Sequence, residues 1–273
     1  MYIAGKIASK ELLLNYLSVS ENSDKQLING TRPEIVEQVF TRINTALSKA
    51  ALNNCSEIEE TFSEKIDSGT SDLKSLKLIA ELMQKSNCIS SDFYGDLYEK
   101  LNSIEPSADY AYTLAWYYIR KEKFEAAVSY LKKSIELEKD TDKQAHYYYQ
   151  LALICNTKMK LQEDAVNYAQ NAINLLPSWG EPYFVIANAY ILGSKECFEG
   201  AFERESVYWV ATDKCIKAKN IDKTVEEKAN GLIADFVRFF PNNEEIFFRS
   251  LQEGNEYTVG CWINEKTIVR VRK

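Results

Sequence analysis

One spacing recurs three times in the second half of the chain and constrains its fold more than any other feature. An alanine is followed, four and seven positions later, by small or apolar residues, and each copy lies in a segment with helical periodicity. The three copies are Ala127, Leu131 and Ser134; Ala165, Ala169 and Ala172; and Ala211, Cys215 and Ala218. Such a repeat predicts helix pairs stacked in series, each pair contacting only its neighbours.

A second helix-forming segment precedes each copy and carries a leucine or isoleucine followed by alanine. These dipeptides are Leu114-Ala115, Leu151-Ala152 and Ile186-Ala187, and each is followed by an inward position, at Tyr118, Cys155 and Tyr190. The pattern resembles the tetratricopeptide repeat (TPR), a helix–turn–helix unit of roughly 34 residues. The resemblance implies an all-α fold, a TPR-type α-solenoid with a right-handed stack.

The organisation of the chain follows from these repeats. We expect a helical N-terminal extension of degenerate TPR-like helix pairs over residues 1–106, and three TPR units over residues 107–222. The third unit carries an insertion near residues 193–205. Capping helices and a short C-terminal β-hairpin should fill residues 223–273, because the segment EYTVGCWINEKTIVRVR alternates with period two around Asn264-Glu265.

Composition excludes several classes of function. The net charge is −7, and the lysines and arginines are scattered, so a basic surface for nucleic acid is not predicted. The longest apolar stretch, Tyr183 to Leu192, has about half the length of a membrane span. The N-terminal sequence is not a signal peptide, which indicates a cytoplasmic protein if the chain is complete.

The residues that carry chemistry do not form a known catalytic or metal-binding pattern. Six cysteines lack a CxxC pair or a Cys/His cluster, so neither a metal nor a cofactor is predicted. Cys155 and Cys215 fall at inward repeat positions, whereas the other four could form disulfides in an exported protein, with a connectivity that spacing does not select. The single histidine, His146, has no nucleophile signature near it, and no phosphate-binding loop is present.

A binding groove is the better hypothesis for a site. In a TPR stack the first helix of each pair lines the concave face, and aromatic side chains with polar neighbours suit an extended peptide. The predicted groove residues are Asp109, Tyr112, Thr113, Trp116 and Arg120; His146, Tyr149, Gln150 and Leu153; and Glu181, Phe184, Val185 and Asn188. An error of one residue in register would exchange groove for core.

A more specific resemblance covers nearly all of the chain. The tail NEYTVGCWINEKTIVRVRK, the segment WGEPYFVIANAY and the stretch around Phe239-Phe240-Pro241 resemble a family of longer, usually exported, bacterial TPR proteins of unassigned activity. The resemblance implies that upstream repeats and an export signal precede Met1, and that the protein is periplasmic or exported. It also implies disulfides between Cys55 and Cys88 and between Cys197 and Cys261.

The function indicated by the sequence is a non-catalytic scaffold that binds a protein or peptide in the groove. One alternative is an assembly protein whose C-terminal hairpin adds a strand to a neighbour. A second alternative is an enzyme with an unrecognised site, for example in the insertion between Lys195 and Glu205.

Overall fold

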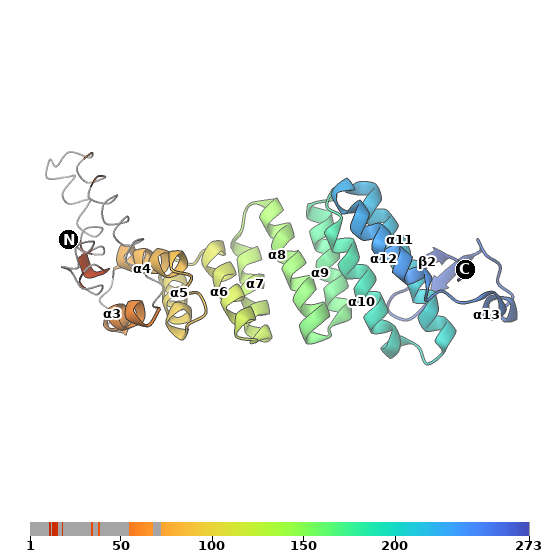
Figure 1. Cartoon of the computed structure of the whole chain (residues 1–273), viewed down its shortest axis with the longest axis horizontal. Helices are drawn as coiled ribbons and strands as arrows, with labels where there is room; N and C mark the ends of the chain where they lie inside the picture. The colour runs from red at the N-terminus through yellow and green to blue at the C-terminus, as the bar shows by residue number, and fades with distance from the viewer. Residues whose placement is uncertain are drawn as a thin grey trace. The chain divides into compact units, whose positions relative to one another are not determined.

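The computed structural model describes residues 55–67 and 72–272, together with residues 11, 13–15, 18, 34 and 38. These residues form helices stacked in pairs and a two-stranded antiparallel sheet (Figure 1). The fold class expected from the sequence is therefore confirmed. The chain divides into two compact units, Met1–Lys123 and Phe124–Lys273. Apart from the few positions given, the helices expected over residues 1–54 lie outside the described residues.

The described helices of the first unit are short, and α4, α5 and α6 have side-chain caps at their N-termini. They are α3 (Cys55–Asp67), α4 (Leu73–Lys85), α5 (Asp92–Ile104) and α6 (Ala108–Arg120). The side chains of Asp72, Ser91 and Ser107 each accept a hydrogen bond from the backbone N–H three residues further on, which satisfies an otherwise unpaired donor. The Cys55 and Cys88 sulfurs lie 2.08 Å apart and link the start of α3 to the segment after α4.

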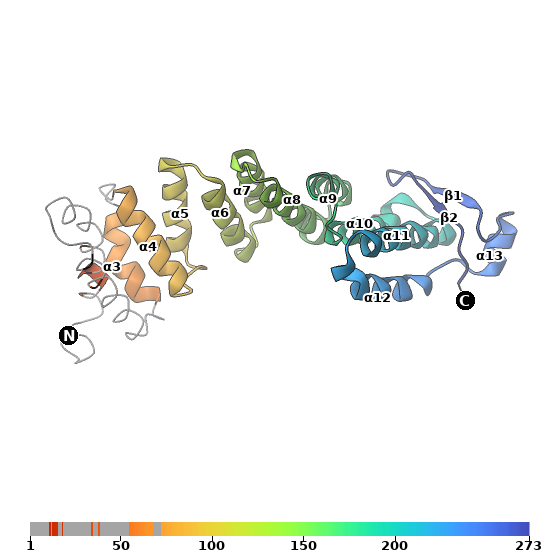
Figure 2. The same cartoon turned by 90° about the horizontal axis from the view of Figure 1, so that it is seen from above.

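The second unit contains the longer helices and the sheet. Its elements are α7 (Phe124–Leu137), α8 (Thr141–Ile154), the π-helical turn η2 (Cys155–Met159), α9 (Gln162–Leu175), α10 (Glu181–Cys197), α11 (Ala201–Ile221), the 3₁₀ turn η3 (Lys223–Val225), α12 (Glu226–Val237), α13 (Asn243–Phe248), β1 (Glu256–Val259) and β2 (Glu265–Ile268). Helices α8 to α12 pack in chain order, each against the next (Figures 1 and 2).

Small residues hold these helices close together. The alanines of the repeated spacing, among them Ala165, Ala169 and Ala172, have no exposed surface. A larger side chain at these positions would force the helices apart, since protein interiors are packed nearly as densely as organic crystals. None of the helices in the described part of the chain is both long enough and apolar enough to cross a membrane.

The predicted insertion lengthens two helices and leaves almost no loop. Helix α10 has 17 residues and α11 has 21, compared with 14 in α8 and in α9. Of residues 193–205, only residues 198–200 lie outside these two helices, so most of the extra residues extend the helices and few form a loop between them. The helices continue because Phe202, Ser206 and Trp209 keep a buried face at helical spacing.

The hairpin turn lies earlier than the sequence predicts. Val259 pairs with Glu265, so residues 260–264 form the connection and Glu265 belongs to β2. Cys261 and Asn264 have positive φ values of 60° and 41°. Glu265 is held in the strand by Tyr190, which donates a 2.6 Å hydrogen bond to it, and by Lys214 at 2.6 Å.

The sheet packs on α10 and α11 and completes their core. Val259 and Val269 are fully buried, and the Thr267 hydroxyl donates a 2.6 Å hydrogen bond to Asp213 of α11. The Arg270 guanidinium pairs with the same carboxylate. A two-stranded sheet alone is marginally stable in water, so these contacts explain why it forms here.

Candidate functional site

Three aromatic rings gather on one surface of the second unit. The His146 and Trp179 ring centroids are 4.4 Å apart, and those of Tyr149 and Trp179 are 4.7 Å apart. His146 is exposed, whereas Tyr149 and Trp179 are half-buried. We call these three residues the Trp179 surface. His146 and Tyr149 lie one turn apart on α8, so they face the same side of the helix.

The connection between α9 and α10 places Trp179. The backbone N–H of Trp179 donates a 3.1 Å hydrogen bond to the Leu176 carbonyl, and the backbone N–H of Gly180 donates one of 3.0 Å to the Asp222 carboxylate. A Cβ at Gly180 would lie 2.6 Å from a methyl group of Val225, so only glycine fits. The connection is thereby fixed against η3 and presents the indole to α8.

An ion pair borders the Trp179 surface. The Glu181 carboxylate lies 2.6 Å from the Lys228 ammonium group and accepts a 3.4 Å hydrogen bond from the Tyr149 hydroxyl. Lys228 also lies over the Phe184 ring, 4.7 Å from its centroid. Burial, followed by the negative charge of Glu181, raises the pKa of Tyr149 to about 12. Tyr149 is therefore a neutral hydrogen-bond donor at physiological pH.

The structure brings some of the predicted groove residues together and separates others. His146, Tyr149 and Glu181 lie around Trp179, which the sequence analysis did not select. Asn188 is exposed and accepts a 2.9 Å hydrogen bond from the buried Asn156. Gln150 and Leu153 are half-buried.

Two of the predicted groove residues belong to the core. Phe184 and Val185 retain only 7% and 5% of their surface exposed. Helix α10 contacts α8, α9 and α11, and Phe184 additionally lies beneath Lys228 of α12. Because α10 is covered on most of its circumference, the assignment of Phe184 and Val185 to a groove is wrong.

The predicted groove residues of the first unit lie on α6. The rings of Tyr112 and Trp116 meet edge to face at 6.2 Å, and both are half-buried, as is Thr113. Asp109 is exposed. The exposed Arg120 donates a 2.8 Å hydrogen bond to the Ile89 carbonyl, so its guanidinium is tied to the segment before α5.

The described residues hold neither a cluster of metal ligands nor an activated thiol. In the described part of the chain, no three His, Cys, Asp or Glu residues lie close enough to hold a metal ion. Burial raises the pKa of the free thiols, to about 11 for Cys155 and about 12 for Cys215. A thiol is nucleophilic as its thiolate, so neither cysteine is activated at neutral pH.

The fold and this surface define an α-helical repeat protein with TPR-like pairs. No protein-family model matches the chain, and no curated protein matches it. Among solved structures, a crystal structure of MamA is similar with a TM-score of 0.46 and 18% identity, covering 64% of this chain and 90% of that chain. A second crystal structure of MamA has a TM-score of 0.45 and 18% identity, covering 81% and 95%. At these values, nothing about function follows from the likeness.

Proposed function

We propose that the protein is a non-catalytic scaffold that binds an extended peptide or protein segment on the Trp179 surface. The observation that carries this proposal is the cluster of His146, Tyr149 and Trp179, three adjacent rings that remain partly exposed. Tyrosine and tryptophan dominate the energetics of protein interfaces. Here they lie on a helix and on a connection fixed by Gly180, so little ordering cost falls on the scaffold.

The surface also offers polar groups for orienting a ligand. The Tyr149 hydroxyl, the Glu181 carboxylate and the Lys228 ammonium group lie beside the rings. An extended segment could place an apolar side chain on Trp179 and pair its backbone with these groups. The α6 residues Tyr112 and Trp116 are proposed as a separate contact surface of the first unit.

The two alternative functions receive less support. The sheet makes its contacts within the chain, through Asp213, Trp209 and Tyr190, which accounts for the hairpin without a partner strand. Residues 193–205 are almost entirely helical, so they do not offer a loop of candidate catalytic groups. We therefore propose binding without turnover.

Site-specific photo-crosslinking tests the proposal. A benzophenone amino acid at position 146 of the full chain should crosslink to a discrete protein in extracts of its source cell. Trp179→Ala in the same chain should abolish that product, while circular dichroism shows an unchanged helix content.

A matched control places the benzophenone at Phe247, whose side chain is 77% exposed on α13. The same product from both positions, or its persistence in the Trp179→Ala chain, would contradict binding at the Trp179 surface.

A further inference from the structure

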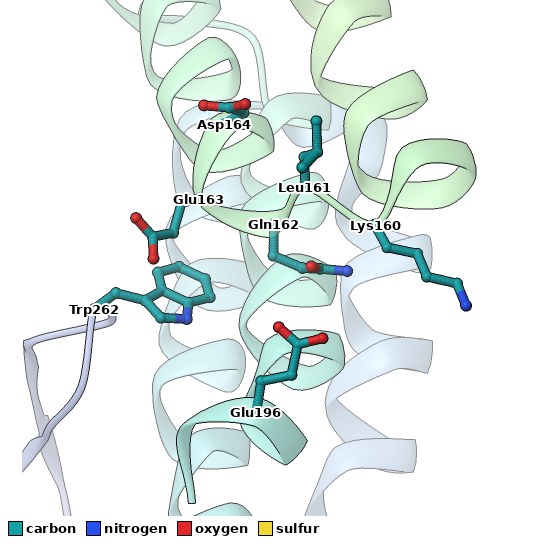
Figure 3. A pocket seen from close by; sticks show the side chains of 7 residues that line it. All are labelled: Lys160, Leu161, Gln162, Glu163, Asp164, Glu196 and Trp262. Atoms are coloured by element: carbon teal, nitrogen blue, oxygen red, sulfur yellow. The ribbon is translucent and has the colours of Figure 1, made fainter. Parts of the chain in front are cut away.

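A separate hollow of about 320 Å³ lies where the start of α9, the end of α10 and the hairpin turn meet (Figure 3). It shares no residue with the Trp179 surface. The Trp262 indole forms one wall, and the rest is lined by Lys160, Leu161, Gln162, Glu163, Asp164 and Glu196. We call it the Trp262 hollow.

The indole is held in place from three directions. Trp262 lies so close to α10 that a Cβ at Gly193 would be 2.6 Å from the ring atom Cζ2. The Tyr190 ring packs 5.6 Å from it, centroid to centroid. The adjacent Cys261 is linked to Cys197 at the end of α10, with the sulfurs 2.22 Å apart. The half-buried ring is thus a fixed wall with one part facing the hollow.

The charges that line the hollow are mainly negative. Figure 3 shows Glu163 just above the indole, and the Gln162 amide and the Glu196 carboxylate to the right of the ring. The Lys160 ammonium group points away from Trp262 in the same view. Among the described ion pairs, none involves Glu163 or Glu196, so both carboxylates can receive a cation from outside.

The arrangement selects an organic cation over a metal ion. The carboxylates are not grouped closely enough with other ligands to coordinate a metal. A flat aromatic wall attracts an ammonium or guanidinium group through its π face, and flanking carboxylates accept hydrogen bonds from the same group. A lysine or arginine side chain supplies both the cation and an apolar stem that packs along the indole.

We propose that the Trp262 hollow receives a lysine or arginine side chain of a partner protein. The negative net charge of the chain favours a basic segment of the partner. This inference goes beyond binding at the Trp179 surface, since the two places differ in residues, charge and type of side chain bound.

Nuclear magnetic resonance tests the proposal on the full chain. The indole N–H signal of Trp262 is assigned from a Trp262→Phe chain and followed during titration with acetyl-Gly-Lys-Gly-amide. We expect a saturable shift with a Kd of roughly millimolar strength, as suits a single side chain. The same peptide with arginine in place of lysine should bind in the same way. The peptide with norleucine in place of lysine lacks the charge and should bind at least roughly fivefold more weakly.

A charge variant provides the second arm. Glu163→Gln combined with Glu196→Gln keeps the size of both side chains and should weaken the binding of the lysine peptide at least roughly fivefold. Glu226→Gln combined with Glu227→Gln on α12 changes the net charge equally and should leave the Kd unchanged. The proposal is overturned by an absent shift, by equal binding of the norleucine peptide, or by equal loss in both charge variants. Binding at the Trp179 surface would be unaffected by any of these results.

Discussion

The Trp209 indole N–H donates a 2.8 Å hydrogen bond to the backbone carbonyl of Arg270, which joins α11 to the chain just beyond β2. Trp209 is fully buried, and the rings of Phe202 and Tyr257 meet it edge to face. The C-terminal hairpin therefore shares a core with α11, the longest helix in the described part of the chain.

Replacing Trp209 with alanine should lower the free energy of unfolding of the second unit by about 3–5 kcal/mol, because the change leaves a cavity and an unpaired carbonyl. Urea denaturation followed by far-ultraviolet circular dichroism measures this. Phe247→Ala is the matched control: the side chain is 77% exposed, so its loss should change stability by less than about 0.5 kcal/mol. A loss below about 1 kcal/mol for Trp209→Ala would show that the hairpin core contributes little.

Removing the Cys197–Cys261 disulfide should destabilise the second unit by about 4 kcal/mol. The two cysteines are 64 positions apart in the sequence, and the unfolded chain gains conformational entropy when the loop between them is no longer closed. Thermal unfolding of a Cys197→Ser, Cys261→Ser chain measures the effect. The transition of the second unit should then no longer respond to a reductant. A response that persists in this variant would assign the sensitivity to the link between Cys55 and Cys88 instead.

Two glycine-to-alanine substitutions in helices should change the free energy of unfolding in opposite directions. Gly193→Ala should cost about 1 kcal/mol or more, because its Cβ would lie 2.6 Å from the Trp262 ring and force the indole to move. Gly231→Ala in α12 meets no atom within 4 Å, so the better helix propensity of alanine should add about 0.5–1 kcal/mol. Denaturant midpoints give both values. Equal gains for the two variants would mean that Trp262 does not pack on α10.

Glu181→Gln should lower the pKa of Tyr149 from about 12, because the negative carboxylate disfavours the phenolate. The pKa should stay above the ordinary value of 10.0, since burial is the larger cause. Titration of the tyrosine Cζ resonances by nuclear magnetic resonance measures the change, with Glu227→Gln as the control that should leave it unaltered. An unchanged pKa in the Glu181→Gln chain would place the carboxylate too far from the phenol to act.

The same raised pKa has a consequence for stability. The folded chain keeps the Tyr149 proton at a pH where the unfolded chain has lost it. This contribution to the free energy of unfolding is present below pH 10 in full and should decline as the pH rises toward about 12.

The helix pairs were predictable from the sequence because close helix contact requires small residues at fixed spacing, and Ala165, Ala169 and Ala172 meet that requirement. His146, Tyr149 and Glu181 could be selected for the same reason, since their places on α8 and α10 follow from the repeat. Trp179 could not, because its position depends on a hydrogen bond between Gly180 and Asp222, 42 residues apart in the sequence.

The errors arose where tertiary contacts changed the exposure of a helix. Phe184 lies beneath Lys228, a residue 44 positions later in the sequence, so its burial depends on the packing of α12. The hairpin turn lies at residues 260–264 and not at Asn264-Glu265, as the sequence predicted, for a related reason. Tyr190 and Lys214 hold Glu265 in β2, and no local pattern around Asn264 encodes those partners.

The extended third helix pair also limits how the chain can be recombined. Helices α8 and α9 have ordinary lengths, and their contacts are with neighbouring helices, as in a portable repeat. A chimera that borrowed α10 and α11 without the C-terminal segment would instead expose Phe202 and Trp209 to water. These two helices and the hairpin must therefore be transplanted as a single cassette, joined to foreign repeats only on the side of α9.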